Sequence, residues 1–346
     1  MLARLFAVGK GGIVKLYYAT SKNGNFGDDM NLWFWDYFLP EWQDHYTDRT
    51  LFGIGSILGT GVLERHGKVL VCGSGSGYSS LGPVDPDLVR ISWVRGPLTA
   101  RLMGLDDSVA ISDPASLLTI MPEFADLPRG GNGTIFIPHR ATAQLQINWH
   151  RVGQLCNLQV VLPNKDAKEV IRKIIGADQV VTESMHGAIM ADAFRIPWVP
   201  IKISNQFNDH KWNDWAMGLG LTIQAPVSLA LPKKLWQLAA SLKSHLRTAK
   251  VRKPAALLAA TSSANAKTVQ MPKTGSFDLG EDGRQRVKRL LQLVAPVIER
   301  TLASDIRRAM RHHVHLSVEG RTEKLTAQMC DQLDVTGDII RKSRWH

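Results

Sequence analysis

Short apolar runs alternate with helical patterns over the first 230 residues of the chain. The runs are rich in valine and isoleucine, are apolar on both faces, and end in glycine, serine, aspartate or proline, which is typical of buried parallel strands. Repeated strand–helix units of this kind predict doubly wound α/β sheets. The predicted strands are residues 13–19, 51–54, 68–72, 89–94, 109–112, 134–137, 158–162, 179–182 and 198–203. The predicted helices include residues 97–103, 141–156, 167–175 and 188–194.

A glycine-rich break at residues 128–133 separates these units into two halves of similar length. We therefore predict two Rossmann-like domains, residues 1–128 and 129–246, that face each other across a cleft. Ligands are expected in that cleft, at the carboxyl ends of the strands. Residues 247–280 lack periodic apolar spacing and are rich in alanine, serine, lysine and proline, as expected of a linker. Residues 281–346 are predicted to form a basic helical extension.

The extension combines an apolar stripe with a basic one. Such a helix either docks on the protein with its charged face in solvent, or rests as an amphipathic helix on an anionic inner-membrane surface. Pro296 is expected to kink it. Nucleic acid is not an expected partner, because no aromatic platform or recognised module accompanies the charge. The apolar stripe comprises Val287, Leu290, Leu291, Val294, Ile298, Leu302, Ile306 and Met310, and the basic residues are Arg284, Arg286, Lys288, Arg289, Arg300, Arg307, Arg308 and Arg311.

Charge and cysteine content narrow the protein class. Residues 241–346 carry 20 lysines and arginines against 10 acidic residues, whereas residues 1–240 carry 22 against 21, so the basic excess lies in the extension. No run of 18 apolar residues predicts a membrane span, and the N-terminus does not read as a signal peptide. The three cysteines, Cys72, Cys156 and Cys330, are too far apart for a zinc site or a disulfide framework. We therefore expect a cytoplasmic protein, at most peripheral on the inner face of the membrane.

Two polar stretches follow predicted strands of the first half. Asp28 and Asp29 come after a glycine-containing loop, where they would open a helix and cap its free N–H groups, or act as a general base. The stretches GIGSILGTG and CGSGSGYSS have glycines that let the backbone approach a ligand. The first resembles a dinucleotide fingerprint, but it follows the second strand and a nicotinamide cofactor is not expected. The predicted substrate-binding residues of these stretches are Asn25, Gly55, Ser56, Gly75 and Ser76.

Cationic residues end three further strands. Arg95 precedes a proline that would start a helix, and its guanidinium either binds a carboxylate or phosphate, or forms an ion pair between the domains. His139 and Arg140 follow the first strand of the second half. His186 and Glu183 lie between a strand and a small-residue helix whose N-terminus favours an anion. Together these side chains predict an electropositive pocket in an otherwise neutral body.

These stretches, taken in order, resemble the polysaccharide pyruvyl transferase family, and its bacterial exopolysaccharide members in particular. The resemblance covers roughly residues 13–220 and lies in GNFGDDMN, GIGSIL, CGSGSG, WVRGPLTARLMG, SDPASLL, IPHR and ESMHGAIMADAFRIPWVPI. It implies a two-domain architecture like that of the GT-B glycosyltransferases. It also implies phosphoenolpyruvate as donor, a sugar of a lipid-linked oligosaccharide as acceptor, and a pyruvate ketal and phosphate as products. Many members carry arginine where this chain has Ser184.

On this resemblance, His186 is expected to be the general acid that protonates the enol carbon, and Asp28 or Asp29 the base or hydroxyl anchor. Glu183 would orient His186 or bind the acceptor. The anionic groups of the donor would be held by Arg95, His139, Arg140 and Lys211. No metal or other cofactor is expected, because the cationic side chains supply the positive field. Tyr78, Trp33 and Trp35 are candidates for stacking on sugar, although packing is the expected role of the tryptophans.

Two other functions fit parts of the sequence. A glycosyltransferase that uses a nucleotide sugar would have the same two-domain cleft. A non-catalytic scaffold of a polysaccharide assembly complex would need the basic extension but not His186. The cluster of histidine and arginine at the strand ends favours an enzyme.

Overall fold

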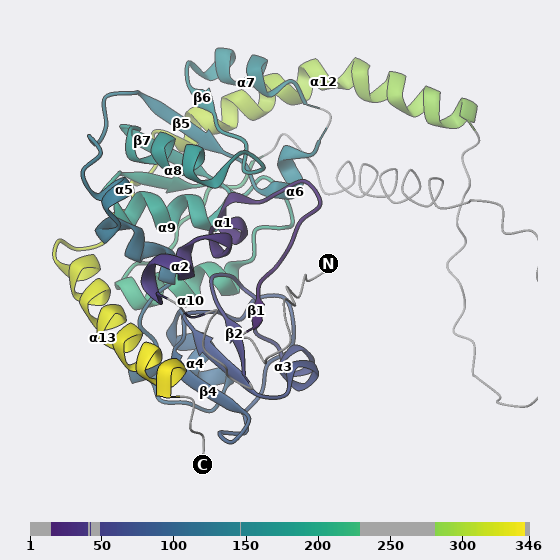
Figure 1. Cartoon of the computed structure of the whole chain (residues 1–346). Coiled ribbons are helices and arrows are strands. Elements are labelled where there is room, and N and C mark those ends of the chain that lie inside the picture. The colour runs from purple at the N-terminus through teal and green to yellow at the C-terminus, as the bar shows by residue number, and fades with distance from the viewer. Residues whose placement is uncertain (1–14, 41, 43–48, 146, 229–280, 343–346) are drawn as a thin grey trace, which may run out of the picture.

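Two parallel β-sheets form the body of the protein (Figure 1). The structure is a computed structural model, and it describes residues 15–40, 42, 49–145, 147–228 and 281–342. The first sheet has the order β1 (Lys15–Tyr17), β2 (Thr50–Phe52), β3 (Val69–Cys72) and β4 (Val89–Trp93), so each strand adds on the same side of the one before. The second has the order β6 (Gln159–Val160), β5 (Thr134–Ile137), β7 (Gln179–Thr182) and β8 (Trp198–Pro200). The chain is therefore α/β. In the second sheet β6 and β7 lie on opposite sides of β5, so among the described strands this is the place where the side on which strands are added changes.

Short helices lie between the strands of the first sheet and between its last strand and the second sheet. They are α1 (Phe26–Asp29), η1 (Met30–Leu32), α2 (Phe34–Phe38), α3 (Thr60–His66), α4 (Pro97–Leu102), η2 (Asp107–Val109), η3 (Pro114–Ile120) and α5 (Pro122–Ala125). The second sheet is accompanied by α6 (Arg140–Ala143), α7 (Trp149–Cys156), α8 (Ala167–Ile175), α9 (Met185–Ala193) and α10 (Asp209–Leu219). As predicted, Asp166 caps α8 by accepting a hydrogen bond from the backbone of Glu169, and Pro97 is the first residue of α4.

Three predictions of local structure are wrong. Residues 109–112 do not form a strand: Asp106 caps η2 there, and a single bridge joins Val94 to Ala110. The predicted helix 141–156 is two helices, because Asn148 caps a new start by accepting from the backbone of Arg151. Residues 28 and 29 end α1 instead of opening a helix.

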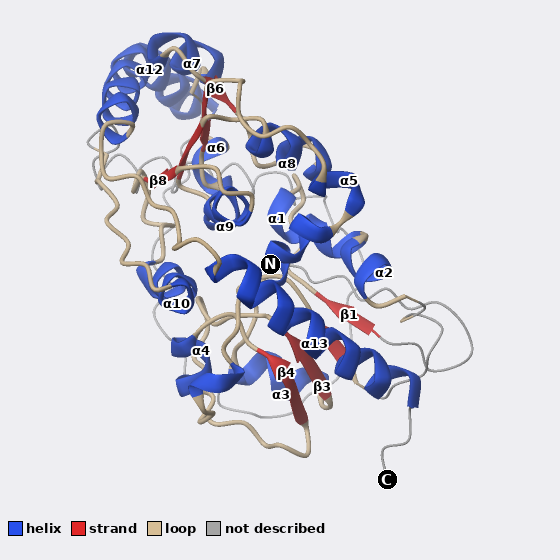
Figure 2. Cartoon of the chain, turned by 90° about the vertical axis from the view of Figure 1, so that its left-hand side faces the viewer, coloured by secondary structure: helices blue, strands red, loops and turns tan. Residues whose placement is uncertain are grey.

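The two sheets share one continuous apolar core, which includes Leu70 and Trp93 of the first sheet and Ile135 and Val180 of the second. The helices α1, α9 and α10 lie between the sheets (Figure 2). The carboxyl ends of strands from both sheets therefore reach the same region of the molecule, which is where the candidate residues are found.

The C-terminal region packs on both halves of the body. Helix α12 (Glu281–Ala309) lies against α7, and Leu302 and Ile306 are buried in the same apolar cluster as Phe136 of the second sheet. Helix α13 (Arg321–Lys342) then returns to the first sheet, where it packs on β4 and η3 (Figure 1). The apolar stripe of α12 from residue 302 onward is thus covered by protein, in agreement with the docked-helix interpretation. The predicted linker, residues 247–280, lies outside the described residues.

Among the described helices, none combines the length and the apolar character needed to cross a membrane.

Candidate active site

His186 lies where β7 passes into α9, as the second residue of the helix. Its side chain is only 10% exposed, and Nε2 lies 3.9 Å from Oδ2 of Asp113. Within the described part of the chain, neither of these two buried atoms has a hydrogen-bond partner. Buried polar groups are nearly always satisfied, so two orphaned atoms that face each other mark a place where a ligand or a proton belongs.

Helix α1 packs directly against the imidazole. A Cβ atom on Gly27 would lie only 2.0 Å from Nδ1 of His186, so no other residue fits at this position without moving the ring. The ring of Phe26 meets the same imidazole edge-on, with 6.4 Å between centroids. This close approach places Asp28, the next residue of α1, beside the histidine.

Asn25 donates hydrogen bonds to both aspartates of α1. Its side-chain amide donates to Oδ2 of Asp28 at 2.5 Å, and its backbone N–H donates to Oδ2 of Asp29 at 2.7 Å. Burial raises the pKa of Asp28 to about 6, against the opposing effects of the Asn25 hydrogen bond and the charges of Lys211 and Arg140. Burial also raises the pKa of Asp29. Asp28 is therefore a half-buried carboxylate between cations and is able to exchange a proton near neutral pH.

The loop after β3 is joined to the start of α10 by three successive residues. Ser76 Oγ lies 2.8 Å from Nε2 of His210, the carbonyl of Gly77 accepts from Asn208, and the hydroxyl of Tyr78 accepts from Nζ of Lys211 at 2.8 Å. Lys211 is 9% exposed, whereas Tyr78 is 53% exposed. These contacts thus bury the ammonium group of Lys211 beneath the ring of Tyr78, which remains exposed to solvent.

His139 and Glu183 are engaged in the local structure. Glu183 accepts from the backbone and hydroxyl of Ser204 through Oε1, and from the backbone of His139 through Oε2. Nδ1 of His139 accepts from the backbone of Ala141 and so caps α6. Burial and the charge of Lys211 lower the pKa of His139 to about 3. Both carboxylate oxygens of Glu183 are therefore occupied in joining β5, β7 and the segment after β8.

Arg95 is an ion-pair residue in this structure. Its guanidinium has no exposed surface and donates to Oδ2 of Asp214, to the hydroxyl of Ser56 and to the carbonyl of Ser76. It lies against Gly75, where a Cβ atom would approach Cζ to 2.2 Å. Direct contact between Arg95 and a substrate would require this network to open, so in this structure Arg95 forms an ion pair with a residue 119 positions along the chain and not a free anion site.

Of the remaining candidate residues, some lie at the site and others pack behind it. Arg140 donates to the hydroxyl of Ser21 and is half-buried near both aspartates of α1. Gly55 has a φ of +136°, and a Cβ atom there would lie 3.5 Å from Oδ1 of Asp28. Trp35 is buried and donates to Asn31, which agrees with a packing role.

The electrostatics of His186 follow from its surroundings. Burial, together with the charges of Lys211 and Arg95, lowers its pKa to about 3. Burial raises the pKa of Asp113 to about 6 against the opposing charge of Arg95. At neutral pH the imidazole is therefore uncharged, and a bound anion would favour its protonation.

Sequence reasoning missed Asp113 and Asp214. Asp113 stands in the SDPASLL stretch, where an aspartate before proline indicates a helix cap, and Oδ1 does accept from the backbone of Ala115. A second signal was available, since Asp113 follows an apolar run as the other site residues do. Asp214 lies inside α10 and has no local signal, because its partner Arg95 is 119 residues away.

Comparisons with known proteins cover most of these residues. The family model described as polysaccharide pyruvyl transferase matches residues 62–205, a span that includes Arg95, Asp113 and His186. The succinoglycan biosynthesis protein ExoV of Rhizobium meliloti (strain 1021) is 42% identical over 219 residues, which is 62% of this chain and 69% of that protein. No solved structure matches the chain significantly.

Proposed function

Because the chain belongs to the polysaccharide pyruvyl transferase family, we propose that it transfers the enolpyruvyl group of phosphoenolpyruvate to a sugar of a lipid-linked exopolysaccharide repeat unit. The product is a pyruvate ketal, and phosphate leaves. The name of the similar Rhizobium meliloti protein, which refers to succinoglycan biosynthesis, supports an exopolysaccharide acceptor. The observation that carries the proposal is that Nε2 of His186, near the start of α9, and Oδ2 of Asp113, at the start of η3, face each other without hydrogen-bond partners among the described residues, with Lys211 close by.

The donor is expected to bind with its anionic groups toward Lys211 and Arg140. Lys211 has Tyr78 as its hydrogen-bond partner and lies close enough to affect the pKa of both His186 and Asp28. Helix α9 begins at Met185, and the side chain of its N-cap residue Ser184 makes no capping hydrogen bond, so the N–H groups of the first turn favour an anion. We propose that Lys211 supplies the charge that many family members place at the position of Ser184.

Protonation of the donor is assigned to His186. The carboxylate and phosphate of phosphoenolpyruvate oppose the effect of Lys211 and Arg95, so the pKa of the imidazole rises when the donor binds. The imidazolium gives its proton to the methylene carbon, and Asp113 stabilises the charged ring. C2 then becomes electron-deficient and accepts one sugar hydroxyl, whose proton passes to Asp28. A second hydroxyl displaces phosphate, and its proton leaves with that group.

The acceptor is proposed to lie over Tyr78. Its ring is exposed at the entrance to the buried Lys211, and an aromatic face of this kind suits the C–H face of a hexose. We place the reaction in the cytoplasm at the inner face of the membrane, where a lipid-linked acceptor is assembled, and we propose that the two sheets and the region between them work as a GT-B-like pair of domains.

The proposed function is tested with purified full-length protein, phosphoenolpyruvate and extracted lipid-linked oligosaccharides. We expect phosphate release to match a gain of one pyruvate ketal in the mass of the acceptor. Phosphoenolpyruvate alone should raise the melting temperature, because a ligand that binds the native state stabilises it. Stabilisation by a UDP- or GDP-sugar, without phosphate release from phosphoenolpyruvate, would instead support the glycosyltransferase.

The role of Asp28 predicts a pH dependence. A carboxylate with a pKa of about 6 is ionised above that pH and protonated below it. In the donor-bound enzyme, where His186 is proposed to be protonated, kcat should therefore fall as the pH decreases through the pKa of Asp28. We expect Asp28→Asn to lower kcat by about 10²- to 10⁴-fold, the usual contribution of a general base. The measurement is the rate of phosphate release between pH 5 and 8, a range chosen to span the pKa of Asp28.

Asp29→Asn is the matched control, because it makes the same chemical change one residue away. It should retain most of the activity and the dependence on pH. An equal loss in both variants, or an unaltered profile in Asp28→Asn, would remove Asp28 as the base.

A further inference from the structure

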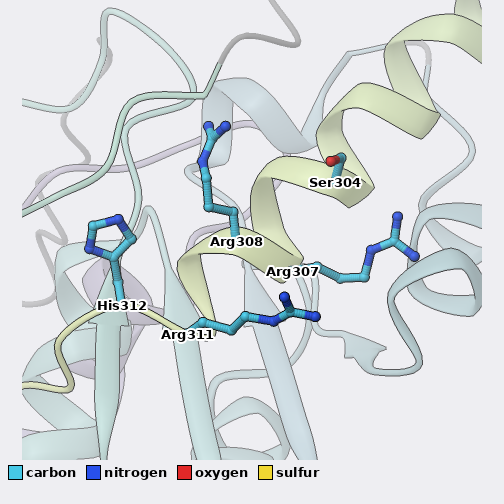
Figure 3. A pocket seen from close by; sticks show the side chains of 5 residues that line it. All are labelled: Ser304, Arg307, Arg308, Arg311 and His312. Carbon is cyan, nitrogen blue, oxygen red and sulfur yellow. The ribbon is translucent and has the colours of Figure 1, made fainter.

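A basic hollow lies at the end of α12, away from the residues of the candidate active site. It has a volume of about 590 Å³ and is lined by Ser304, Arg307, Arg308, Arg311 and His312 (Figure 3). The side chains of Arg307 and Arg311 extend to the same side of the helix end. Three guanidinium groups on little more than one helical turn repel one another, so their grouping points to an anion as the ligand.

The charges of the hollow are only partly compensated. Arg308 pairs with Asp305 at 2.7 Å, and Asp305 also accepts from the hydroxyl of Ser228. Arg307 donates to the backbone carbonyl of Leu155, which is neutral. Within the described residues, no carboxylate pairs with Arg307 or Arg311. Two positive charges therefore remain, more than the roughly half negative charge of the helix C-terminus can balance.

The opposite side of the helix is already occupied. Leu302, Ile306 and Ala309 are buried against the second sheet and α7, so this part of α12 cannot insert an apolar stripe into a bilayer. What it offers to a partner is its basic side. Next to that side lies Val227, which is 61% exposed and whose carbonyl accepts from Arg308. A surface with exposed cations and an exposed valine suits the headgroup layer of a membrane.

We propose that this hollow binds the phosphate of anionic phospholipid headgroups and so holds α12 flat on the membrane surface. Guanidinium groups present paired N–H donors that match phosphate oxygens, and a volume of this size admits a headgroup. Among the described residues that line the hollow, His312 is the only ring on which a nucleobase could stack, which favours lipid over nucleic acid. Membrane binding would benefit catalysis by bringing the enzyme close to a lipid-linked acceptor, and this benefit rests on the proposed function. Membrane binding itself does not.

The test is co-sedimentation of the full-length protein with phosphatidylglycerol–phosphatidylcholine vesicles and with pure phosphatidylcholine vesicles, without substrates. We expect binding to the anionic vesicles only. The variant Arg307→Gln/Arg311→Gln should partition about 30-fold more weakly, because each surface arginine contributes about a factor of five. Arg308 is left intact, since its loss would strand the buried Asp305.

Arg65→Gln/Arg101→Gln is the control, because it removes the same charge from exposed sites on α3 and α4. It should bind vesicles nearly as well as the unmodified protein. Equal weakening in both double variants would overturn the proposal, since net charge alone would then explain binding. Two further results would also overturn it: stabilisation by inorganic phosphate without vesicle binding, which indicates a free-phosphate site, and binding to single-stranded RNA but not to vesicles. None of these measurements depends on pyruvyl transfer. Failure of the transferase assay would therefore contradict the proposed function without contradicting the proposed membrane binding.

Discussion

Replacing His186 with glutamine is expected to abolish turnover, with a loss in kcat of about 10²- to 10⁴-fold from the missing proton transfer alone. Glutamine keeps a polar side chain of similar reach but cannot deliver a proton to the methylene carbon of the donor. The buried Asp113, whose Oδ2 faces Nε2 of the histidine at 3.9 Å, would then lack the ring whose charge it is proposed to stabilise. The measurement is phosphate release in single-turnover experiments, with binding of phosphoenolpyruvate followed separately.

His139→Gln is the matched control, since this half-buried histidine caps α6 through Nδ1 and is given no role in proton transfer. It should lose far less activity than His186→Gln. Gly27→Ala tests the position of the imidazole from its Nδ1 side, because the added Cβ would lie 2.0 Å from Nδ1 and displace the ring. Normal turnover in His186→Gln would refute the assignment of the acid and would favour the non-catalytic scaffold.

Removal of the Asp214 carboxylate is expected to give the largest effect on stability. In Asp214→Ala the guanidinium of Arg95, which has no exposed surface, is left buried without its counter-charge, and the backbone and hydroxyl of Thr99 lose an acceptor. Breaking one side of a buried ion pair costs about 3–5 kcal/mol of the free energy of unfolding. Denaturant titration followed by circular dichroism measures this loss.

Two comparisons make the result specific. Asp107→Ala breaks the ion pair with Arg101, whose side chains are 45% and 55% exposed, and should cost less than about 1 kcal/mol. The double variant Arg95→Met/Asp214→Leu removes both charges and should be much more stable than Asp214→Ala, because no lone charge remains. If the single and double variants lose the same stability, burial of the lone charge is not the cause.

Much of the architecture was predictable because its signals are local. The apolar runs at residues 134–137 and 179–182 are strands with these bounds, and residues 167–175 form the predicted helix with its predicted cap. The same reasoning placed His186 at a strand–helix junction. Predictions failed where a nearby side chain altered the backbone, as when Asn148 started a new helix inside an apparently continuous one.

The composition of the candidate site was predictable only in part. Strand-end positions led to His186, Asp28 and Arg140, the family resemblance added Lys211, and the structure brings these residues together. It also shows that Arg95 and Glu183 are engaged by Asp214 and Ser204. A guanidinium or carboxylate at the end of a strand looks the same in the sequence whether a substrate or another side chain neutralises it.

The sequence by itself determined the α/β class, most strands, the family and the location of the histidine, because hydrophobic period, capping residues and contiguous motifs are properties of neighbouring positions. Only the tertiary structure decided that Asp113 faces His186, that Asp214 neutralises Arg95, and that the apolar side of α12 from residue 302 onward covers protein while Arg307 and Arg308 stay exposed. These depend on which distant segments meet, and a buried charge or an apolar stripe carries no mark in the sequence of the partner that will satisfy it.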